Sequence, residues 1–205
     1  YNLQPLHRIE CYDASNSAMY DSTVSMTVMT DGLLDNGQYR RFKIKNPRSV
    51  SDFDRLDEAL TRRLKNTSWP IPDLIVIDGA PQAADLAISV IKASNLVLIP
   101  VQPSPYDIWA ASDLVDLVKQ RIEMTDGRLK AAFVVSRAIK NTKIGAEIRE
   151  ALEGYGLPVL AARVTQSVAY PSTAAAGTTV LDAEPNSNAA QEIRGLADEV
   201  LALLK

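Results

Sequence analysis

The sequence is poor in the residues that build disulfides and zinc sites. Its 205 residues include one cysteine, Cys11, and one histidine, His7. A single cysteine excludes an internal disulfide and a cysteine cluster for zinc. Cys11 lies in a strand-like segment, which favours an inert buried thiol, because a reactive thiol needs exposure and a lowered pKa. Cysteine chemistry is therefore not expected.

Strong positive charge and long hydrophobic runs are also missing. The formal net charge is -3, which argues against a strongly basic nucleic-acid-binding surface and leaves only weak DNA binding through local patches. The longest apolar runs, such as residues 93–101, are too short to span a bilayer and lack the flanks of a signal peptide. We therefore expect a cytoplasmic protein that does not bind membranes. Its oligomeric state stays open.

Glycine is scarce as well. The nine glycines are scattered, and none precedes Lys-Ser or Lys-Thr at the spacing of a phosphate-binding loop. The glycine-rich loop that cradles nucleotide phosphates is therefore missing from these residues. Ordinary ATP hydrolysis is excluded on this ground.

The first third of the chain has the pattern of an antiparallel meander. Short segments rich in β-branched or aromatic residues predict strands at residues 8–14, 23–30 and 39–45. Asp31-Gly32 and Asn36-Gly37 are turn signals between them. Apolar and hydroxyl residues alternate in residues 23–30, which is typical of a strand with one buried and one wetter face. A helix through Leu64 follows, with Leu56, Leu60 and Leu64 in its buried stripe.

From residue 74 onward, strands and helices alternate. The predicted strands are residues 74–77, 96–101, 131–135 and 158–161, and the predicted helices are residues 82–93, 107–123, 144–153 and 189–204. Continuous apolar strands separated by helices predict parallel strands buried on both faces. We expect one α/β domain over residues 1–205, in which a three-stranded antiparallel meander continues into a parallel sheet with helices on both faces.

Three details of this predicted sheet bear on its centre and its edges. Ile75 and Ile77 are expected on one buried face and Leu74 and Val76 on the other. The strand at residues 96–101 is expected at an outer position, because displacing the hairpin would unpair two ladders of backbone groups. Residues 169–188 are predicted to form a loop.

Three segments of the first part, residues 7–15, 38–44 and 52–63, resemble the RNase H-like endonuclease domain of UvrC, the incision nuclease of DNA nucleotide-excision repair. The resemblance runs to about residue 78 and assigns residues 1–73 to a UvrC-like segment. It implies that Asp13, with Ser15, matches the first catalytic motif and that Asp78 matches the second aspartate. Two carboxylates at neighbouring strand ends suit Mg²⁺ or Mn²⁺. Asp107 is a candidate third ligand.

The resemblance is incomplete at the catalytic site. The downstream acid and histidine of the family are replaced by other sequence, and His7 precedes the first strand. Two carboxylates rarely hold Mg²⁺ without substrate phosphates. We therefore expect a vestigial site at Asp13 and Asp78, no tightly bound cofactor, and low-affinity binding of Mg²⁺ or Mn²⁺.

Segments of the second part, residues 78–82, 98–107 and 161–166, resemble the carboxyl half of ParA/MinD-type partition ATPases. This resemblance covers residues 74–205. It implies a vestigial nucleotide-binding region that includes Arg163, Gln166 and Pro185.

The two resemblances share the predicted strand at residues 74–79. We interpret the chain as a catalytically incompetent, engineered chimera of a UvrC-type segment and a ParA-type segment. Two alternatives stay open: a weak metal-dependent nuclease that uses Asp13 and Asp78, and a ParA-like module that binds nucleotide or DNA without hydrolysis. Partners other than weakly bound DNA are not indicated.

Overall fold

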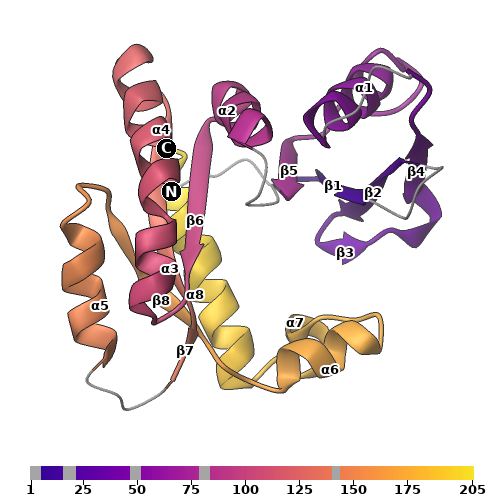
Figure 1. Ribbon diagram of the computed structural model, residues 1–205. Helices are drawn as coiled ribbons and strands as arrows, with labels where there is room; N and C mark the ends of the chain where they lie inside the picture. The colour runs from indigo at the N-terminus through magenta and orange to yellow at the C-terminus, as the bar shows by residue number, and fades with distance from the viewer. Residues whose placement is uncertain (1–5, 16–21, 47–51, 79–83, 140–143) are drawn as a thin grey trace. The chain divides into compact units, whose positions relative to one another are not determined.

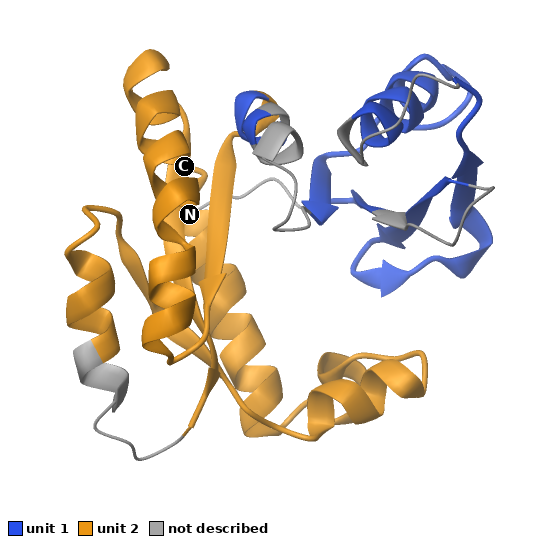
Figure 2. Cartoon of the chain, in the orientation of Figure 1, with its two compact units in different colours: residues 1–92 blue, residues 93–205 orange. Residues whose placement is uncertain are grey.

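A computed structural model describes residues 6–15, 22–46, 52–78, 84–139 and 144–205. The protein has a mixed α/β architecture with two compact units, residues 1–92 and 93–205 (Figures 1 and 2). One sheet is built from strands of the first unit and another from strands of the second.

The sheet of the first unit contains the predicted meander. Its elements are β1 (Arg8–Ser15), β2 (Thr23–Thr30), β3 (Leu33–Leu34), the 3-10 helix η1 (Asn36–Gln38), β4 (Arg40–Lys43), α1 (Asp52–Leu64) and β5 (Leu74–Asp78), followed by α2 (Ala84–Ala93). Strand β2 pairs antiparallel with β1, β3 and β4, and β1 pairs parallel with β5. Asp31 and Gly32 have φ values of 50° and 80°, as a two-residue type I′ turn requires.

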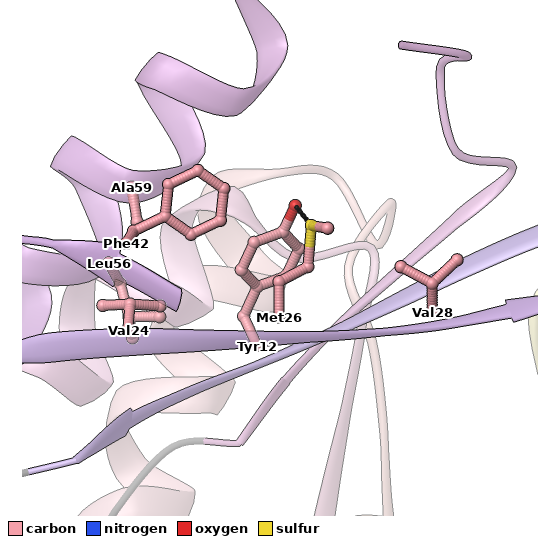
Figure 3. Close-up of a cluster of buried hydrophobic side chains, with 7 residues drawn as sticks. All are labelled: Tyr12, Val24, Met26, Val28, Phe42, Leu56 and Ala59. Carbon is pink, nitrogen blue, oxygen red and sulfur yellow. Dashed lines mark hydrogen bonds between the residues drawn. The ribbon is translucent and has the colours of Figure 1, made fainter. Parts of the chain in front are cut away.

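One face of this sheet forms the core of the first unit. Figure 3 shows the buried cluster, which consists of Tyr12, Val24, Met26, Val28, Phe42, Leu56 and Ala59. The β2 members of the cluster are at most 1% exposed, whereas Ser25 and Thr27 alternate with them on the other face. The alternation predicted for residues 23–30 is therefore confirmed. Ile75 and Ile77 pack against the same cluster.

Helix α1 buries a different stripe from the predicted one. Leu56 is 2% exposed, but Leu64 is 52% exposed, and Arg63 is buried at 1%. The guanidinium of Arg63 turns inward because it binds the buried carboxylate of Glu10. The prediction that Leu64 belongs to the buried stripe was therefore wrong.

Strand β5 is assigned to the sheet of the first unit. In the described residues, β5 pairs with β1 alone, and Val76 is 42% exposed instead of buried. Strand β6 (Leu96–Val101) pairs with β7 (Lys130–Ala138) in the second sheet, and the outer position expected for it stays a prediction. Each sheet has its own cluster of buried side chains, so apolar surface is removed from water within each unit. The predicted hairpin pairing is intact.

The second unit is a parallel sheet with helices on both faces. Its elements are β6, α3 (Pro105–Ala110), α4 (Ser112–Met124), β7, α5 (Ile144–Glu153), β8 (Val159–Thr165), α6 (Ala169–Ala175), α7 (Val180–Ala183) and α8 (Asn188–Leu203). Strand β7 lies between β6 and β8 and is parallel to both. Ala132 and Val134 of β7 pack against α8, whereas Phe133, on the opposite face, contacts the ring of Tyr155.

Two predictions for this unit need correction. The helix expected at residues 107–123 is two helices, α3 and α4, and Asp107 lies in the first turn of α3 after Ser104 and Pro105. Proline suits the first position of a helix, because its missing N–H has no partner there in any case. The loop expected at residues 169–188 contains α6 and α7, which pack against α8 through Ala169, Val180 and Ala189. Within the described ranges, no helix combines the length and apolarity needed to cross a bilayer.

The buried face of α1 can be tested by truncation. Leu56→Ala should lower the free energy of unfolding of the first unit by about 2–5 kcal/mol, the range for emptying a buried leucine site. The matched control is Leu64→Ala on the same helix, which should change this free energy by less than about 0.5 kcal/mol. Urea denaturation followed by far-UV circular dichroism measures both. Equal losses in the two variants would contradict the assignment of the buried face.

The same denaturation tests the single domain predicted for residues 1–205. Trp69 lies in the first unit and Trp109 in the second, so the variants Trp109→Phe and Trp69→Phe each leave one fluorescent reporter. Coincident transitions support the single-domain prediction, and separate transitions contradict it.

Candidate carboxylate site

Strand pairing brings two of the predicted site residues together. In the parallel β1–β5 pair, Asp13 and Asp78 are register partners, and partners in a ladder project from the same face of a sheet. Both residues are exposed. Tyr12, the neighbour of Asp13, projects into the core on the opposite face, so both carboxylates lie on the face away from α1. The sequence-based placement of the two aspartates at neighbouring strand ends agrees with this geometry.

Both carboxylates act on the electrostatics of Cys11. Cys11 precedes Asp13 by two residues and lies on the same face of β1. Burial raises the pKa of the Cys11 thiol, and the negative charges of Asp78 and Asp13 raise it further. The half-buried thiol is thus held in its neutral form, in agreement with the expectation of an inert cysteine.

The paired carboxylates offer hard oxygen ligands of the kind that Mg²⁺ and Mn²⁺ prefer. Asp107 belongs to the second unit, and its role as a third ligand stays a prediction. Across the described residues, no group of three or more histidine, cysteine, aspartate or glutamate side chains could hold a metal ion. The geometry therefore supports a two-carboxylate site that would need further oxygen ligands from water or a phosphate.

The two aspartates have register partners on the next two strands of the sheet, β2 and β4. Asp13 is the register partner of Ser25, and Ser25 is the register partner of Arg41. Asp78, Asp13, Ser25 and Arg41 thus form one row on one face of the sheet, which we call the cross-strand row. Sequence reasoning missed Ser25 and Arg41, although the strict alternation of β2 marked Ser25 as a residue of the wetter face.

On the opposite face of β1, Glu10 forms a buried ion cluster. Glu10 is 0% exposed, and its Oε1 accepts hydrogen bonds from Arg8 Nε and Arg63 Nη2, each at 2.7 Å. Its Oε2 accepts the hydrogen bond of the Tyr12 hydroxyl at 2.6 Å. Arg63 Nη2 also donates to the carbonyl oxygen of Pro70 at 2.5 Å. The cluster therefore ties β1 to α1 and to the segment that leads into β5.

Opposing effects act on the protonation of this cluster. Burial alone would raise the pKa of the Glu10 carboxyl, but hydrogen bonds from Arg63, Tyr12 and Arg8 outweigh it and hold the pKa below its usual value. Burial and the hydrogen bond to Glu10 raise the pKa of the Tyr12 hydroxyl. Glu10 is thus charged and Tyr12 neutral at pH 7, which is the combination that the hydrogen bonds require.

The three residues predicted for nucleotide binding have different surroundings in the second unit. Arg163 of β8 lines a groove of about 540 Å³ between β8 and α8, together with Asn188 and Gln191. Gln166 and Pro185 are not among the residues that line this described groove. The backbone N–H of Gln166 donates to Ala138, and the carbonyl oxygen of Pro185 accepts from Arg194 Nη1 at 2.7 Å.

Two carboxylates of α8 occupy the wall of this groove. Glu199 accepts hydrogen bonds from the backbone N–H groups of Ala161 and Ala162 at 2.7 and 2.6 Å. Glu192 accepts from the backbone N–H and the hydroxyl of Thr165 at 2.9 and 2.8 Å. Burial, followed by the charge of Glu192, raises the pKa of Tyr170 to about 12. Negative charge at the groove disfavours nucleotide phosphates.

The carboxylate pair can be tested through the single cysteine of the chain. Asp13→Asn and Asp78→Asn should each lower the pKa of Cys11, because each removes a negative charge that opposes the thiolate. The rate of iodoacetamide alkylation, measured against pH, should then rise at a lower pH than in the unmodified protein. Asp57→Asn on α1 is the control and should leave the profile unchanged. An unchanged profile in either site variant would show that its carboxylate lies far from the thiol.

The Glu10 cluster predicts a pH dependence of stability. The pKa of Glu10 is lower in the folded state than the usual 4.5, so its stabilising contribution is present above about pH 4.5 and is lost as the pH falls through the folded pKa. Glu10→Gln should destabilise the first unit by about 3–5 kcal/mol at pH 7, since it leaves buried guanidinium groups without their anion. It should also weaken the loss of stability on acidification.

Urea unfolding at pH 7 and at pH 4 measures both effects. Glu123→Gln, at an exposed position of α4, is the matched control and should change neither quantity. A pH dependence equal in Glu10→Gln and in the unmodified protein would rule out Glu10 as its source.

Comparison with known proteins identifies the first half of the chain. Residues 1–102 match the family model of the UvrC RNAse H endonuclease domain. The UvrABC system protein C of Desulforapulum autotrophicum is 29% identical over 171 residues, which cover 73% of this chain and 28% of that protein. The same protein of Anaeromyxobacter dehalogenans is 35% identical over 154 residues, which cover 73% of this chain and 21% of that protein. The chain thus spans less than a third of the length of either relative.

Solved structures resemble the chain in fold. The MinD cell division protein of Aquifex aeolicus superposes with a TM-score of 0.55 at 18% identity, over 75% of this chain and 62% of that chain. The cell division ATPase MinD of Pyrococcus furiosus gives a TM-score of 0.52 at 19% identity, over 71% of this chain and 56% of that chain. At these identities the likeness concerns the fold alone. Residues 1–102 are therefore similar to the UvrC RNAse H endonuclease domain, in a chain whose α/β fold resembles that of MinD.

Proposed function

We propose that the chain is a catalytically incompetent chimera whose first unit keeps a weak divalent-cation site at Asp13 and Asp78. The in-register pairing of these two aspartates carries the proposal. The site binds Mg²⁺ or Mn²⁺ through carboxylate oxygens and completes its coordination with water or with the phosphate of a bound nucleic acid. It does not turn over phosphodiester bonds at a useful rate.

Within the described residues the site has two carboxylates, and this small number of ligands supports the proposed lack of turnover. Two-metal nucleases need enough oxygen ligands to place both metal ions, one beside the attacking water and one beside the leaving oxygen. Asp13 and Asp78 are the carboxylates that share the site within the described part of the chain. Two carboxylates hold one cation weakly, and the described residues contain no group of three candidate ligands that could hold a metal ion.

The presence of two resemblances, to UvrC and to the MinD fold, supports a chimera; the UvrC relatives align with 73% of this chain, so this resemblance extends past residue 102. The UvrC family match ends at residue 102, beyond the shared strand at residues 74–79, so it overlaps the ParA-like segment that begins at residue 74. The division between the two compact units, at Lys92 and Ala93, falls inside this overlap. The aspartate of β5 lies in the segment that both resemblances share. An engineered origin and a cytoplasmic location are part of this proposal.

Cation binding tests the proposed function directly. The unmodified protein should bind Mn²⁺ weakly, as followed by the loss of the paramagnetic resonance signal of the hydrated ion on titration. Asp13→Asn and Asp78→Asn should each weaken this binding by roughly tenfold or more, because one carboxylate ligand is lost. Asp57→Asn should bind as the unmodified protein does. Equal binding by all four proteins would contradict a cation site at the paired aspartates.

Activity assays separate the alternatives. Incubation with supercoiled plasmid and Mn²⁺ should give no nicking above background, and robust nicking that disappears in Asp13→Asn would establish the nuclease alternative. The nucleotide-binding alternative is tested at Arg163, which lines the groove of the second unit together with Glu192 and Glu199. A rise in melting temperature with ADP or ATP, lost in Arg163→Ala, would support that alternative.

A further inference from the structure

The cross-strand row separates charge along one face of the first sheet. Asp78 and Asp13 carry negative charge on β5 and β1, and Arg41 carries positive charge on β4. Ser25 of β2 lies between them, with a neutral hydroxyl. A surface of this kind presents a cation site at one end and a site for an anion at the other.

The orientation of Arg41 follows from its two neighbours on β4. Phe42 is buried in the core beneath α1. Arg40 is the register partner of Met26, a core residue that contacts Tyr12, so Arg40 lies on the core face of the sheet. Its guanidinium lies 5.2 Å from the centre of the Trp69 ring. Because successive side chains of a strand project to opposite faces, Arg41 between them projects to the face of Asp13. Arg41 is exposed there.

The spacing of the row can be estimated from the sheet. Neighbouring strands lie about 4.8 Å apart, so the Cα atoms of Asp13 and Arg41, two strands apart, are separated by roughly 10 Å. The guanidinium is therefore too distant to pair with the carboxylate of Asp13 without bending toward it, and it can reach a group that a ligand places beside the carboxylate pair.

Polar groups accompany the row on the same face. Lys43 follows Arg41 by two residues and pairs in register with Thr23, so a second exposed positive charge lies at the β4 end of this face. Thr23, Ser25 and Thr27 supply hydroxyl groups between the two ends. Hydroxyl, lysine and arginine groups are the side chains that contact phosphates in nucleic-acid complexes.

We propose that Arg41, assisted by Lys43, binds a phosphate of a nucleic-acid backbone next to the phosphate that bridges to the cation at Asp13 and Asp78. This inference rests on the proposed cation site and names how its phosphate ligand is held. The backbone crosses the strands of the first sheet, from β5 and β1 to β4, over the hydroxyl groups of β2. Arg41 acts on the backbone alone and reads no base.

The test measures the binding of a fluorescent deoxythymidine oligonucleotide in the presence of Mn²⁺. Arg41→Ala should weaken binding by about two- to fivefold at low salt, the range for one exposed ionic contact. The slope of log affinity against log salt concentration should become shallower by about 0.7, the value for one phosphate contact on a single strand. Arg41→Lys should restore the slope, because it restores the charge. Lys65→Ala, at an exposed position that directly follows α1, is the matched control and should change neither quantity.

Mn²⁺ binding without oligonucleotide distinguishes the two proposals. Arg41→Ala should bind Mn²⁺ as the unmodified protein does, since Arg41 is not a ligand of the cation. Loss of Mn²⁺ binding in Asp13→Asn with an unchanged salt slope in Arg41→Ala would overturn the assignment of Arg41 and leave the cation site intact. Absence of Mn²⁺ binding in every protein would instead overturn the cation site. An oligonucleotide affinity equal in Arg41→Ala and Lys65→Ala would also overturn the role of Arg41.

Discussion

The first unit depends on the hydrogen bonds that Arg8, Arg63 and Tyr12 donate to the buried carboxylate of Glu10. This carboxylate is fully buried and surrounded by two guanidinium groups and a phenol. A buried carboxylate is tolerated only when its oxygens are saturated with donors, and here each donor comes from a different position of the fold. Arg63 can reach Glu10 only when α1 packs across β1, and Tyr12 can reach it only when β1 is extended. The ion cluster therefore selects one packing of helix on sheet.

The ion cluster on one face of β1 also determines which side chains lie on the other face. Glu10 and Tyr12 project toward α1, so Cys11 and Asp13 must project away from it. The parallel partner β5 then places Asp78 beside Asp13, and Arg63 supports this pairing through its hydrogen bond to the carbonyl of Pro70, four residues before β5. The candidate cation site is thus exposed because the ion cluster is buried. Removing the anion of the cluster would leave two cations in the core and loosen the strand that carries Asp13.

The sequence predicts the elements of the first unit better than the partners of its charged residues. Turn signals and alternation are local, so the meander and the buried face of β2 follow from residues 23–30 and from Asp31-Gly32. Arg63 looks like a helix-end cation in the sequence, because nothing local distinguishes it from Arg62, and only the distant Glu10 brings it inside. Val76 has the apolar side chain of a typical buried strand residue, yet it is 42% exposed. The helices α6 and α7 are short, and their stability comes from packing on α8.

The register of β4 against β2 fixes both the packing of the core and the alignment of the cross-strand row. A slip of β4 by one residue against β2 would exchange the faces of Arg41 and Phe42, since side chains alternate along a strand. The slip would bury the guanidinium of Arg41 without a carboxylate partner like the Glu10 that pairs with Arg63. It would also expose the ring of Phe42, which belongs to the core. The burial of Phe42 therefore holds β4 in place for reasons of stability. The same register aligns Arg41 with Ser25 and Asp13, so the charge separation on the exposed face persists as long as the core does, whether or not the chain retains catalysis.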